Sequence, residues 1–328
     1  HEGTTTITTA GPNPAGTTFV DLGGGRWSFT APHVYADDNP TSTSSDSYTL
    51  VITVTDDQGG SASAVETLSV SNVAPLLDPL VLSDSVITEG GTVQLSGTFL
   101  DAGLPDTHEI LIDWGNGSTT TLSTAGPHPA GTTLTDLGGG LWGFSAENFY
   151  TDEAAGGDYA ITVTVSDDDG GIGSASAAVT VNNAGRLLDP LVLSESAIDE
   201  GGSVTLSGTF ADPGLADTHT LTIDWGVGTT TLTTDGPNPP GTTLTDLGGG
   251  SWSFSADNLY PDDDPSGTPG DDYAITVTVT DDGALSGNAA TTVTVNNLAP
   301  SVDPLVLSES AIDEGGSVTL SGTFTDPG

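Results

Sequence analysis

The sequence predicts an all-β protein, an elongated array of tandem β-sandwich domains, and three observations carry that prediction. Large apolar residues alternate with small or polar ones in short runs, which is the period of a strand with one buried face. Stretches rich in Gly, Pro and Asp separate these runs. The pattern returns after 111 and then 114 residues, as the spacing of three Asp-Pro-Leu triplets shows, and such a period fits one β-sandwich per repeat.

The clearest alternating run begins at Tyr273 and ends in an acidic loop. Its large side chains point one way and its threonines the other: Tyr273, Ile275, Val277 and Val279 against Thr276, Thr278 and Thr280. Related runs begin at Tyr48 and Tyr159, and each leads directly into two or three carboxylates. We expect a buried central strand that holds an acidic loop at one end of each domain.

Repeated motifs set the domain boundaries. Asp-Pro-Leu begins at Asp78, Asp189 and Asp303, and Leu-Gly-Gly-Gly-x-Trp begins at Leu22, Leu137 and Leu247. The resulting frame has four parts: residues 1–76 are the last two-thirds of a repeat, residues 77–187 and 188–300 are complete repeats, and residues 301–328 open a further repeat. Short joints are expected at 70–75, 181–185 and 295–300.

The two ends of the chain occupy neighbouring places in the repeat. His1 aligns with Gly226 and Gly328 aligns with Gly214, so the equivalent of residues 215–225 alone is absent between them. Two explanations stay open: the chain is a window from a longer tandem protein, or subunits complete one another head to tail. In both cases we expect the neighbouring partner to be a copy or a repeat of the same chain.

The first half of the repeat 188–300 predicts four strands. A short strand at 191–194 precedes a turn at 199–202, where glycines allow a positive φ. After a loop at 212–217 comes the third strand, and residues 229–233 form a short fourth one. The alternating residues are Val204, Leu206, Gly208 and Phe210 in the second strand, and His219, Leu221, Ile223 and Trp225 in the third.

The second half of this repeat completes the sandwich. A bend at 247–250 leads to a strand on which Trp252 and Phe254 share a face, and a long acidic loop at 261–272 precedes the central strand. The last strand covers 291–295. Short strands of this number, with no helical periodicity, are typical of an immunoglobulin-like sandwich. We expect all five Trp residues in or near the cores.

Two motifs carry a family resemblance. Ile223-Asp224-Trp225-Gly226-Val227-Gly228, followed by the run Tyr273-x-Ile-Thr-Val-Thr-Val-Thr-Asp-Asp, resembles the PKD (polycystic kidney disease) repeat family, whose hallmark is Trp-Asp-Phe-Gly-Asp-Gly. Asp224 matches the first Asp of the hallmark, whereas Val227 and its counterpart Asn116 depart from the second. The resemblance implies immunoglobulin-like spacer, adhesion or binding modules of extracellular, often bacterial, surface proteins.

The composition narrows the choice of partners. The 328 residues include 45 Asp and Glu but 2 Lys and Arg, both arginines, which gives a formal net charge of −43. Such a surface repels nucleic acid and anionic lipid and attracts cations. The lack of Lys excludes a Lys–Asn isopeptide crosslink, and the lack of Cys excludes disulfides. No apolar run is long enough to insert into a membrane.

The predicted strand directions gather the acidic residues at the joints, where we expect Ca²⁺ to stiffen the array. Crowded carboxylates repel one another unless a cation lies among them, and Ca²⁺ takes about six to eight oxygen ligands in irregular geometry. The alternative is a set of solvated turns, since Asp and Asn are common turn residues. The expected ligands at the central joint are Glu89, Asp152, Glu153, Asp158, Asn182, Asn183, Asp212, Asp217, Asp281 and Asp282. Those at the following joint are Glu200, Asp262, Asp263, Asp264, Asp271, Asp272, Asn296 and Asn297, with Asp326. At the first joint Asp37, Asp38 and Asn72 face Asp101, Asp106, Asp167, Asp168 and Asp169.

Other candidate sites are weaker. His108 and His219 begin equivalent strands and are expected to be hydrogen-bonded, since neither has the spacing of a zinc site. No nucleophile–base constellation is legible, so we expect no enzyme. The predicted function is therefore a structural and adhesive one, an extracellular cell-surface stalk or filament with Ca²⁺ at its joints and cell-surface glycans as a further possible partner. The alternative is a carbohydrate-binding accessory module of a secreted enzyme, which would need exposed aromatic residues.

Overall fold

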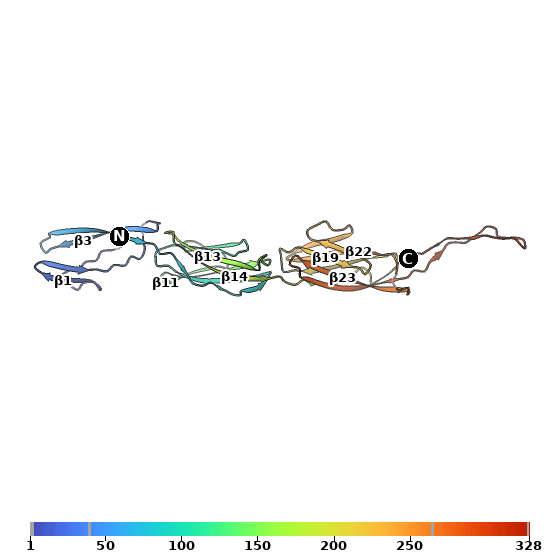
Figure 1. Cartoon of the computed structure of the whole chain (residues 1–328), viewed down its shortest axis with the longest axis horizontal. Helices are drawn as coiled ribbons and strands as arrows, with labels where there is room; N and C mark the ends of the chain where they lie inside the picture. Colours follow the sequence, from blue (N-terminus) through green and yellow to red (C-terminus); the bar gives the residue numbers. More distant parts are fainter. Residues whose placement is uncertain (1–2, 39–40, 264–265, 327) are drawn as a thin grey trace. The chain divides into compact units, whose positions relative to one another are not determined.

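The computed structural model describes residues 3–38, 41–263, 266–326 and 328, and these residues form strands, turns and loops (Figure 1). They include no helix, and therefore none that is long and apolar enough to span a membrane. The chain divides into two compact units. Unit one comprises His1–Ser85, Thr92–Asn148 and Asp158–Val179, and unit two comprises Val86–Gly91, Phe149–Gly157 and Thr180–Gly328.

In unit two, residues 187–296 form a β-sandwich of two five-stranded sheets. The first sheet has the order β15 (Leu187–Leu188), β18 (Gly202–Ala211), β22 (Ser251–Tyr260) and β21 (Thr242–Gly248), with β16 (Val192–Leu193) also paired to β18. The second has the order β17 (Ala197–Asp199), β24 (Ser286–Asn296), β23 (Gly270–Asp281), β19 (His219–Asp224) and β20 (Thr229–Thr233). All pairs are antiparallel except β17 with β24. Two facing sheets with this order make an immunoglobulin-like sandwich.

The core of this sandwich comes from the alternating faces of its strands. On β23, the side chains of Tyr273, Ile275, Val277 and Val279 are all buried, as the period of two predicts. The indole of Trp225, 1% exposed, donates a hydrogen bond to Thr230 Oγ1 at 2.9 Å. Burial of these faces, rather than any ligand, therefore accounts for most of the large aromatic residues.

The sequence 76–182 repeats the same strand order. One sheet runs β11 (Thr133–Gly138), β12 (Leu141–Tyr150), β8 (Gly91–Leu100) and β5 (Leu76–Leu77), with β6 (Val81–Leu82) on β8. The other runs β10 (Thr119–Ser123), β9 (His108–Asp113), β13 (Asp158–Asp167), β14 (Ile172–Asn182) and β7 (Val86–Thr88). The first strand expected at 191–194 corresponds to β16, and the structure adds the short strands β15 and β17 on either side of it, which pair with different sheets. The repeat boundaries at 76, 187 and 300 stay a prediction.

The remaining segments form hairpins with exposed apolar faces. Residues 18–71 contain β1 (Thr18–Gly23) with β2 (Arg26–Thr30) and β3 (Ser45–Thr55) with β4 (Ser61–Ser71). Residues 301–325 contain β25 (Ser301–Val302) with β28 (Phe324–Thr325) and β26 (Val306–Leu307) with β27 (Leu320–Ser321). Trp27 is 48% exposed, which corrects the expectation that all five Trp residues lie in or near cores. Its counterpart Trp252 instead stacks on Phe210 of β18 at 6.4 Å between ring centroids.

Candidate metal centres

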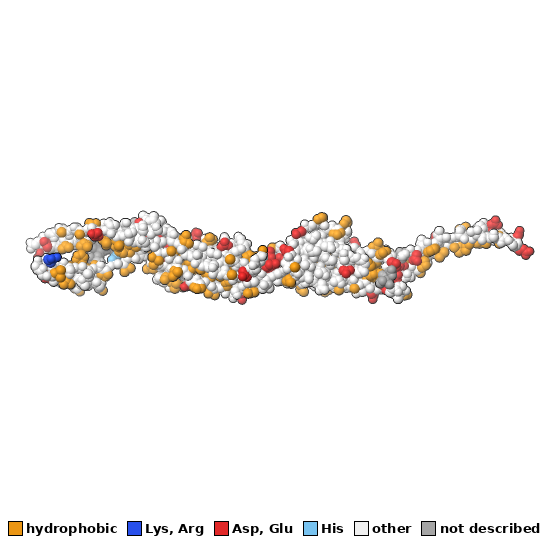
Figure 2. Space-filling model, in the orientation of Figure 1, with side chains coloured by type: hydrophobic (Ala, Val, Ile, Leu, Met, Phe, Trp, Pro, Cys, Tyr) orange, Lys and Arg blue, Asp and Glu red, His pale blue; other side chains and the backbone are white. Residues whose placement is uncertain are grey.

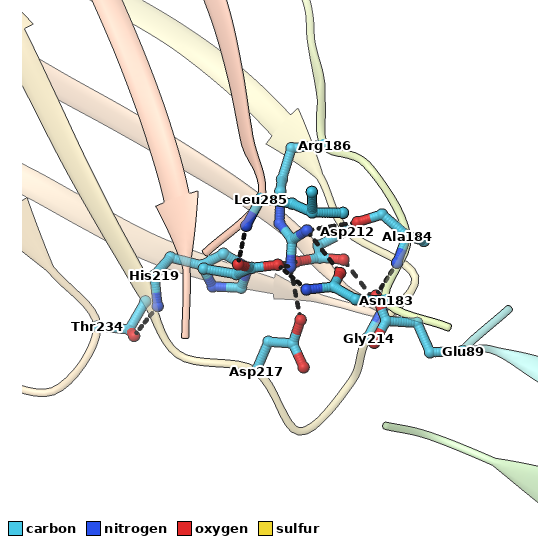
Figure 3. Close-up of polar contacts among 11 residues, drawn as sticks. Glu89, Asn183, Ala184, Arg186, Asp212, Gly214, Asp217, His219, Thr234 and Leu285 are labelled. Carbon is cyan, nitrogen blue, oxygen red and sulfur yellow. Dashed lines mark hydrogen bonds and ion pairs between the residues drawn. The ribbon is translucent and has the colours of Figure 1, made fainter. Parts of the chain in front are cut away.

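Acidic side chains collect in a few patches on the visible surface of the molecule (Figure 2). Two clusters of acidic side chains lie wholly within the residues that the structure describes. The N-terminal cluster lies within unit one and consists of Asp37, Asp38, Asn72, Asp101, Asp106, Asp167, Asp168 and Asp169. The central cluster lies within unit two and consists of Glu89, Asp152, Glu153, Asn183, Arg186, Asp212, Asp217 and Asp281. Figure 3 labels five of these residues: Glu89, Asn183, Arg186, Asp212 and Asp217.

A glycine-rich hairpin fixes the backbone of one aspartate in each cluster, Asp101 in the N-terminal cluster and Asp212 in the central cluster. Between β21 and β22, Gly248, Gly249 and Gly250 have φ values of +84°, +63° and +76°, which L side chains rarely adopt. The N–H of Asp212 donates to the Gly250 carbonyl at 2.8 Å, and a Cβ on Gly250 would overlap the Asp212 carbonyl oxygen. The same contact joins Asp101 to the Gly140 carbonyl at 2.9 Å. The repeated Gly-Gly-Gly motif thus positions a cluster residue as well as turning the chain.

A buried histidine orients the carboxylate of the same aspartate. His219 Nε2 lies 2.6 Å from Asp212 Oδ2, and His108 Nε2 lies 2.9 Å from Asp101 Oδ2. Because an ionised carboxylate can only accept, Nε2 is the protonated nitrogen. Both histidines are therefore hydrogen-bonded at the start of their strands, as the sequence predicts. Burial raises the pKa of Asp212, but the bonds from His219 and the Gly214 N–H, with the charge of Arg186, lower it overall.

Another aspartate of each cluster, Asp167 or Asp281, accepts hydrogen bonds from its own loop and from an asparagine of the linker. Asp281 Oδ1 accepts from the Leu285 N–H at 2.8 Å, and its Oδ2 accepts from Asn183 Nδ2 at 2.7 Å. In the N-terminal cluster, Asp167 Oδ1 accepts from the Gly171 N–H at 2.6 Å and Oδ2 accepts from Asn72 Nδ2 at 2.9 Å. The two clusters therefore share one hydrogen-bonded frame.

The linker that precedes each sandwich passes close to one of its strands: the linker at Pro75 lies against β14, and the linker at Arg186 lies against β24. A Cβ on Gly287 would come within 2.7 Å of the Arg186 carbonyl oxygen, and one on Gly173 would overlap the Pro75 carbonyl oxygen. A glycine at this place in β24 and β14 lets the linker backbone approach. The residue at the equivalent linker position, Arg186 or Pro75, is thereby held beside its cluster.

Arg186 fills the middle of the central cluster (Figure 3). Its side chain is fully buried, and its guanidinium Nη2 lies 2.6 Å from Asp212 Oδ2, 2.6 Å from Asp217 Oδ2 and in contact with Asp281 Oδ2. Nη1 donates to Asn183 Oδ1 at 2.9 Å and to the Ala184 carbonyl. Three carboxylates, an amide oxygen and a peptide oxygen thus surround one positive charge.

The N-terminal cluster holds the corresponding carboxylates with no basic side chain among them. Carboxylate oxygens of Asp101, Asp106 and Asp167 lie within 4.8 Å of one another. Asp106 is 7% exposed, and neither of its carboxylate oxygens accepts a hydrogen bond from a donor among the described residues; the Asp37 carboxyl beside it can share a hydrogen bond only if one of the two is protonated. Burial, with the charges of Asp37 and Asp101, raises the pKa of Asp106 well above its usual range. A buried carboxylate in this setting calls for a proton or a cation.

Each cluster contains a second group of converging carboxylates. Ligand oxygens of Asp37, Asp38 and Asp169 lie within 4.8 Å of one another, and Asp38 Oδ2 is buried without a partner in the described part of the chain. Burial, with the charges of Asp38 and Asp168, raises the pKa of Asp169 to about 6. The group in the central cluster consists of Glu89, Asp152, Glu153 and Asp217.

Glu89 is the most enclosed member of that central group. It is 2% exposed, its Oε1 accepts from the Ala184 N–H at 2.7 Å, and its Oε2 has no partner among the residues described. Burial raises the pKa of Glu89 to about 7 although the Ala184 bond acts in the opposite direction. Burial and the Asp212 charge likewise raise the pKa of Asp217 to about 7, against the opposing effect of Arg186.

The structure brings many of the expected ligands together and leaves others apart. Glu89, Asp152, Glu153, Asn183, Asp212, Asp217, Asp281, Asp101 and Asp106 lie in the two clusters. Asp272 is exposed and accepts from Thr294 Oγ1 at 2.6 Å, and Asp158 is an exposed residue at the start of β13. Asp282 and Asn182 are also exposed, and Asn182 contributes its carbonyl to the Glu89 N–H.

The group expected at the third joint is less enclosed. Glu200 Oε1 accepts from the Leu298 N–H at 2.7 Å, which repeats the bond between Glu89 and Ala184. Asp263 is buried with one unpartnered oxygen among the described residues, whereas Asp262 and Asn297 are exposed. Asp271 bonds to Ser266, Asn296 Nδ2 donates to the Ile198 carbonyl, and Asp326 is exposed. Asp264 lies outside the described residues.

Sequence reasoning missed Arg186. The available signal was its rarity, because the chain has just two Lys and Arg residues and Arg186 stands in a linker where Pro75 and Pro300 occupy the equivalent places. The side chains at both clusters otherwise offer mainly oxygen atoms, and each of the two histidines uses its Nε2 for an aspartate, while its Nδ1 has no partner among the described residues. The donor set therefore suits a hard, oxygen-seeking cation such as Ca²⁺ better than zinc.

Comparison with known proteins finds similarity to solved structures at low identity and low TM-score. No protein-family model and no curated protein sequence matches the chain. Dimeric latent PorU from Porphyromonas gingivalis is 12% identical with a TM-score of 0.25 over 76% of this chain and 26% of that one, so the chain spans about a quarter of PorU. A tetra-tandem repeat from the extending region of a large adhesion protein is 17% identical, with a TM-score of 0.40 over 85% of this chain and 70% of that one.

The adhesin InvE of Yersinia pseudotuberculosis is 11% identical with a TM-score of 0.31 over 66% of this chain and 60% of that one. At such identities and TM-scores these similarities support no conclusion about fold or function. The strand order of the chain itself makes it an all-β protein of immunoglobulin-like sandwiches, and the assignment to PKD repeats stays a prediction.

Proposed function

We propose that this chain is a segment of an extracellular, adhesive tandem-repeat protein that binds Ca²⁺ in its acidic clusters. The cations hold successive repeats together, and the protein acts as a spacer that carries mechanical load. The observation that carries the proposal is the set of buried carboxylate oxygens without hydrogen-bond partners in the described chain, on Asp38, Glu89 and Asp106.

The physical reason is the cost of burying unpaired charge. A carboxylate removed from water without a partner is strongly destabilised, so it either takes up a proton or binds a cation. Extracellular fluids supply millimolar Ca²⁺, and modules in that setting need affinities of only about 10⁻⁴ to 10⁻³ M. The scarcity of Lys and Arg leaves external cations as the main source of compensating charge.

The clusters also link distant parts of the sequence. Leu104 donates its N–H to the Ala36 carbonyl at 3.2 Å, and Leu215 donates to the Thr151 carbonyl at 3.1 Å. Asn72 reaches Asp167 and Asn183 reaches Asp281 across 95 and 98 residues of sequence. A cation bound among these groups would favour the joined arrangement by binding it more tightly than the separated one.

The test is the melting temperature of the full chain in Ca²⁺ and in a chelator, with two variants. Wild type and Asp84→Asn should melt higher in Ca²⁺, because Asp84 is an exposed residue outside the clusters. Asp106→Asn should gain less, because it removes a ligand from the N-terminal cluster. A wild-type melting temperature that is equal in Ca²⁺ and in chelator would contradict the proposal.

A further inference from the structure

Arg186 is one of the two Lys and Arg residues of the chain, and it is buried. The other, Arg26, is an exposed residue of β2. The guanidinium of Arg186 is fully buried against Asp212, Asp217 and Asp281. A lone buried Arg with several carboxylates compensates their charge rather than forming one surface ion pair.

The N-terminal cluster reproduces the surroundings of Arg186 without the arginine. Its three aspartates each have a counterpart in the central cluster: Asp101 with Asp212, Asp106 with Asp217, and Asp167 with Asp281. The bonds from histidine, from the linker asparagine and from the glycine hairpin are also repeated. The linker residue differs, because Pro75 stands where the central cluster has Arg186.

The oxygen atoms around the guanidinium are of the kinds that bind Ca²⁺. They are three carboxylate oxygens, the side-chain amide oxygen of Asn183 and the backbone carbonyl of Ala184. In the N-terminal cluster the three carboxylates converge within 4.8 Å, and both oxygens of the buried Asp106 have no hydrogen-bond partner in the described part of the chain. The same frame thus surrounds a guanidinium in the central cluster, and in the N-terminal cluster it surrounds carboxylate oxygens that lack a positively charged partner among the described residues.

We propose that the Arg186 guanidinium takes, in the central cluster, the place that a divalent cation occupies among Asp101, Asp106 and Asp167 in the N-terminal cluster. This inference rests on the proposed function, because it presupposes that the N-terminal cluster binds Ca²⁺. In the central cluster Arg186 already contacts Asp212 and Asp217, and the group formed by Glu89, Asp152, Glu153 and Asp217 remains as the place for a metal. The N-terminal cluster, with no guanidinium, binds one cation more.

The exchange has a consequence for the response to calcium. A guanidinium stays charged at any physiological pH and cannot dissociate from the chain, whereas a bound metal leaves when its concentration falls. Residues around Arg186 are therefore held together at all calcium concentrations, and those around Asp106 are held only when Ca²⁺ is present. One chain then contains a permanent connection and a calcium-dependent one.

Calcium bound per full-length chain, measured by equilibrium dialysis at saturating Ca²⁺, tests this inference. Arg186→Gln opens the central position and should bind one ion more than wild type. Pro75→Arg supplies a guanidinium to the N-terminal cluster, where Asn72 and the Val73 carbonyl stand in place of Asn183 and Ala184, and should bind one ion fewer. Arg26→Gln makes the same charge change at an exposed site and should match wild type.

Equal binding by wild type and a folded Arg186→Gln variant would overturn the inference and leave the proposed function standing. If Arg186→Gln does not give an all-β circular dichroism spectrum with Ca²⁺, Pro75→Arg decides, and wild-type binding by that variant overturns the inference. If wild type binds no Ca²⁺, the proposed function fails, and the inference fails with it.

Discussion

The N-terminal and central clusters share one hydrogen-bonded frame but differ in the charge among their carboxylates, because the central cluster holds a guanidinium and the N-terminal cluster holds no Lys or Arg side chain. Both contain a histidine-bound aspartate, a glycine hairpin behind it and a linker asparagine, and the equivalent atoms lie at similar distances. In the central cluster Arg186 contacts all three aspartates, whereas in the N-terminal cluster neither carboxylate oxygen of Asp106 accepts a hydrogen bond from a donor in the described chain. The comparison teaches that the same frame forms whether the linker residue is Arg186 or Pro75.

The largest expected effect is the loss of the internal cation. Arg186→Gln leaves Asp212, Asp217 and Asp281 buried together without compensation, and removing one partner of a buried ion pair costs about 3–5 kcal/mol. Urea unfolding in chelator should show this loss. Addition of Ca²⁺ should recover a large part of it if the metal enters the vacated place.

Arg26→Gln is the matched control for that experiment, and its free energy of unfolding should stay within about 0.5 kcal/mol of wild type. A similar loss in both variants would mean that net charge, rather than the place of Arg186, decides stability. The two clusters would then differ less than their structures indicate.

The next largest effect concerns the glycine hairpin behind Asp101. Gly140 has a φ of +80°, and a Cβ there would overlap the Asp101 carbonyl oxygen, so Gly140→Ala should destabilise the protein by about 3 kcal/mol and weaken Ca²⁺ binding. The neighbouring Gly139 has a φ of +66° but free space around its Cβ position. Gly139→Ala should cost only the backbone strain, about 1 kcal/mol. Equal losses from the two variants would show that the contact with Asp101 is unimportant.

Calcium itself should stabilise the two clusters unequally. At a Ca²⁺ concentration of a hundred times Kd, each site adds about 2.7 kcal/mol to the state that binds. Amide hydrogen exchange should therefore slow more around Asp167 than around its counterpart Asp281, which contacts Arg186, when Ca²⁺ replaces chelator. Equal slowing in both regions would contradict the contrast between a metal and a guanidinium.

The smallest effect is the pH dependence without metal. Burial raises the folded-state pKa of Asp169 to about 6 and that of Glu89 to about 7, so the folded protein holds protons that the unfolded chain releases between about pH 4 and 7. The stability from these groups is full below their ordinary pKa and is lost as pH rises through the folded pKa. In chelator the melting temperature should therefore fall from pH 5 to pH 8.

Calcium should reverse this trend, because the metal needs deprotonated carboxylates and competes with protons for them. The melting temperature in Ca²⁺ should rise or stay level over the same pH range. Parallel falls with and without Ca²⁺ would show that the carboxylates take up protons and not the metal.

The sequence predicted the fold well because strand burial leaves a direct signature. The alternation from Tyr273 to Val279 gave the buried face of β23, and Trp225 is buried as expected. The start of the repeat was predicted in part: β16 lies within the strand expected at 191–194, but the two- and three-residue strands β15 and β17 were missed, because such short pieces leave no local periodicity.

The clusters could be predicted only in part. Loop order brings Asp106, Asp217 and Glu89 to the right regions, but it does not say which loop carboxylate turns inward. Asp272 turns outward to Thr294 instead. The place of Arg186 follows from the close approach of the linker at Gly287, a tertiary contact that sequence spacing does not reveal.

Crystals of the full chain grown in CaCl₂ would test the central claim most directly, through the anomalous signal of the bound metal. A peak among the carboxylates of Asp101, Asp106 and Asp167, with Arg186 and no peak among Asp212, Asp217 and Asp281, is the predicted result. Waters or protonated carboxylates at both places, with no metal peak at the N-terminal cluster, would contradict it.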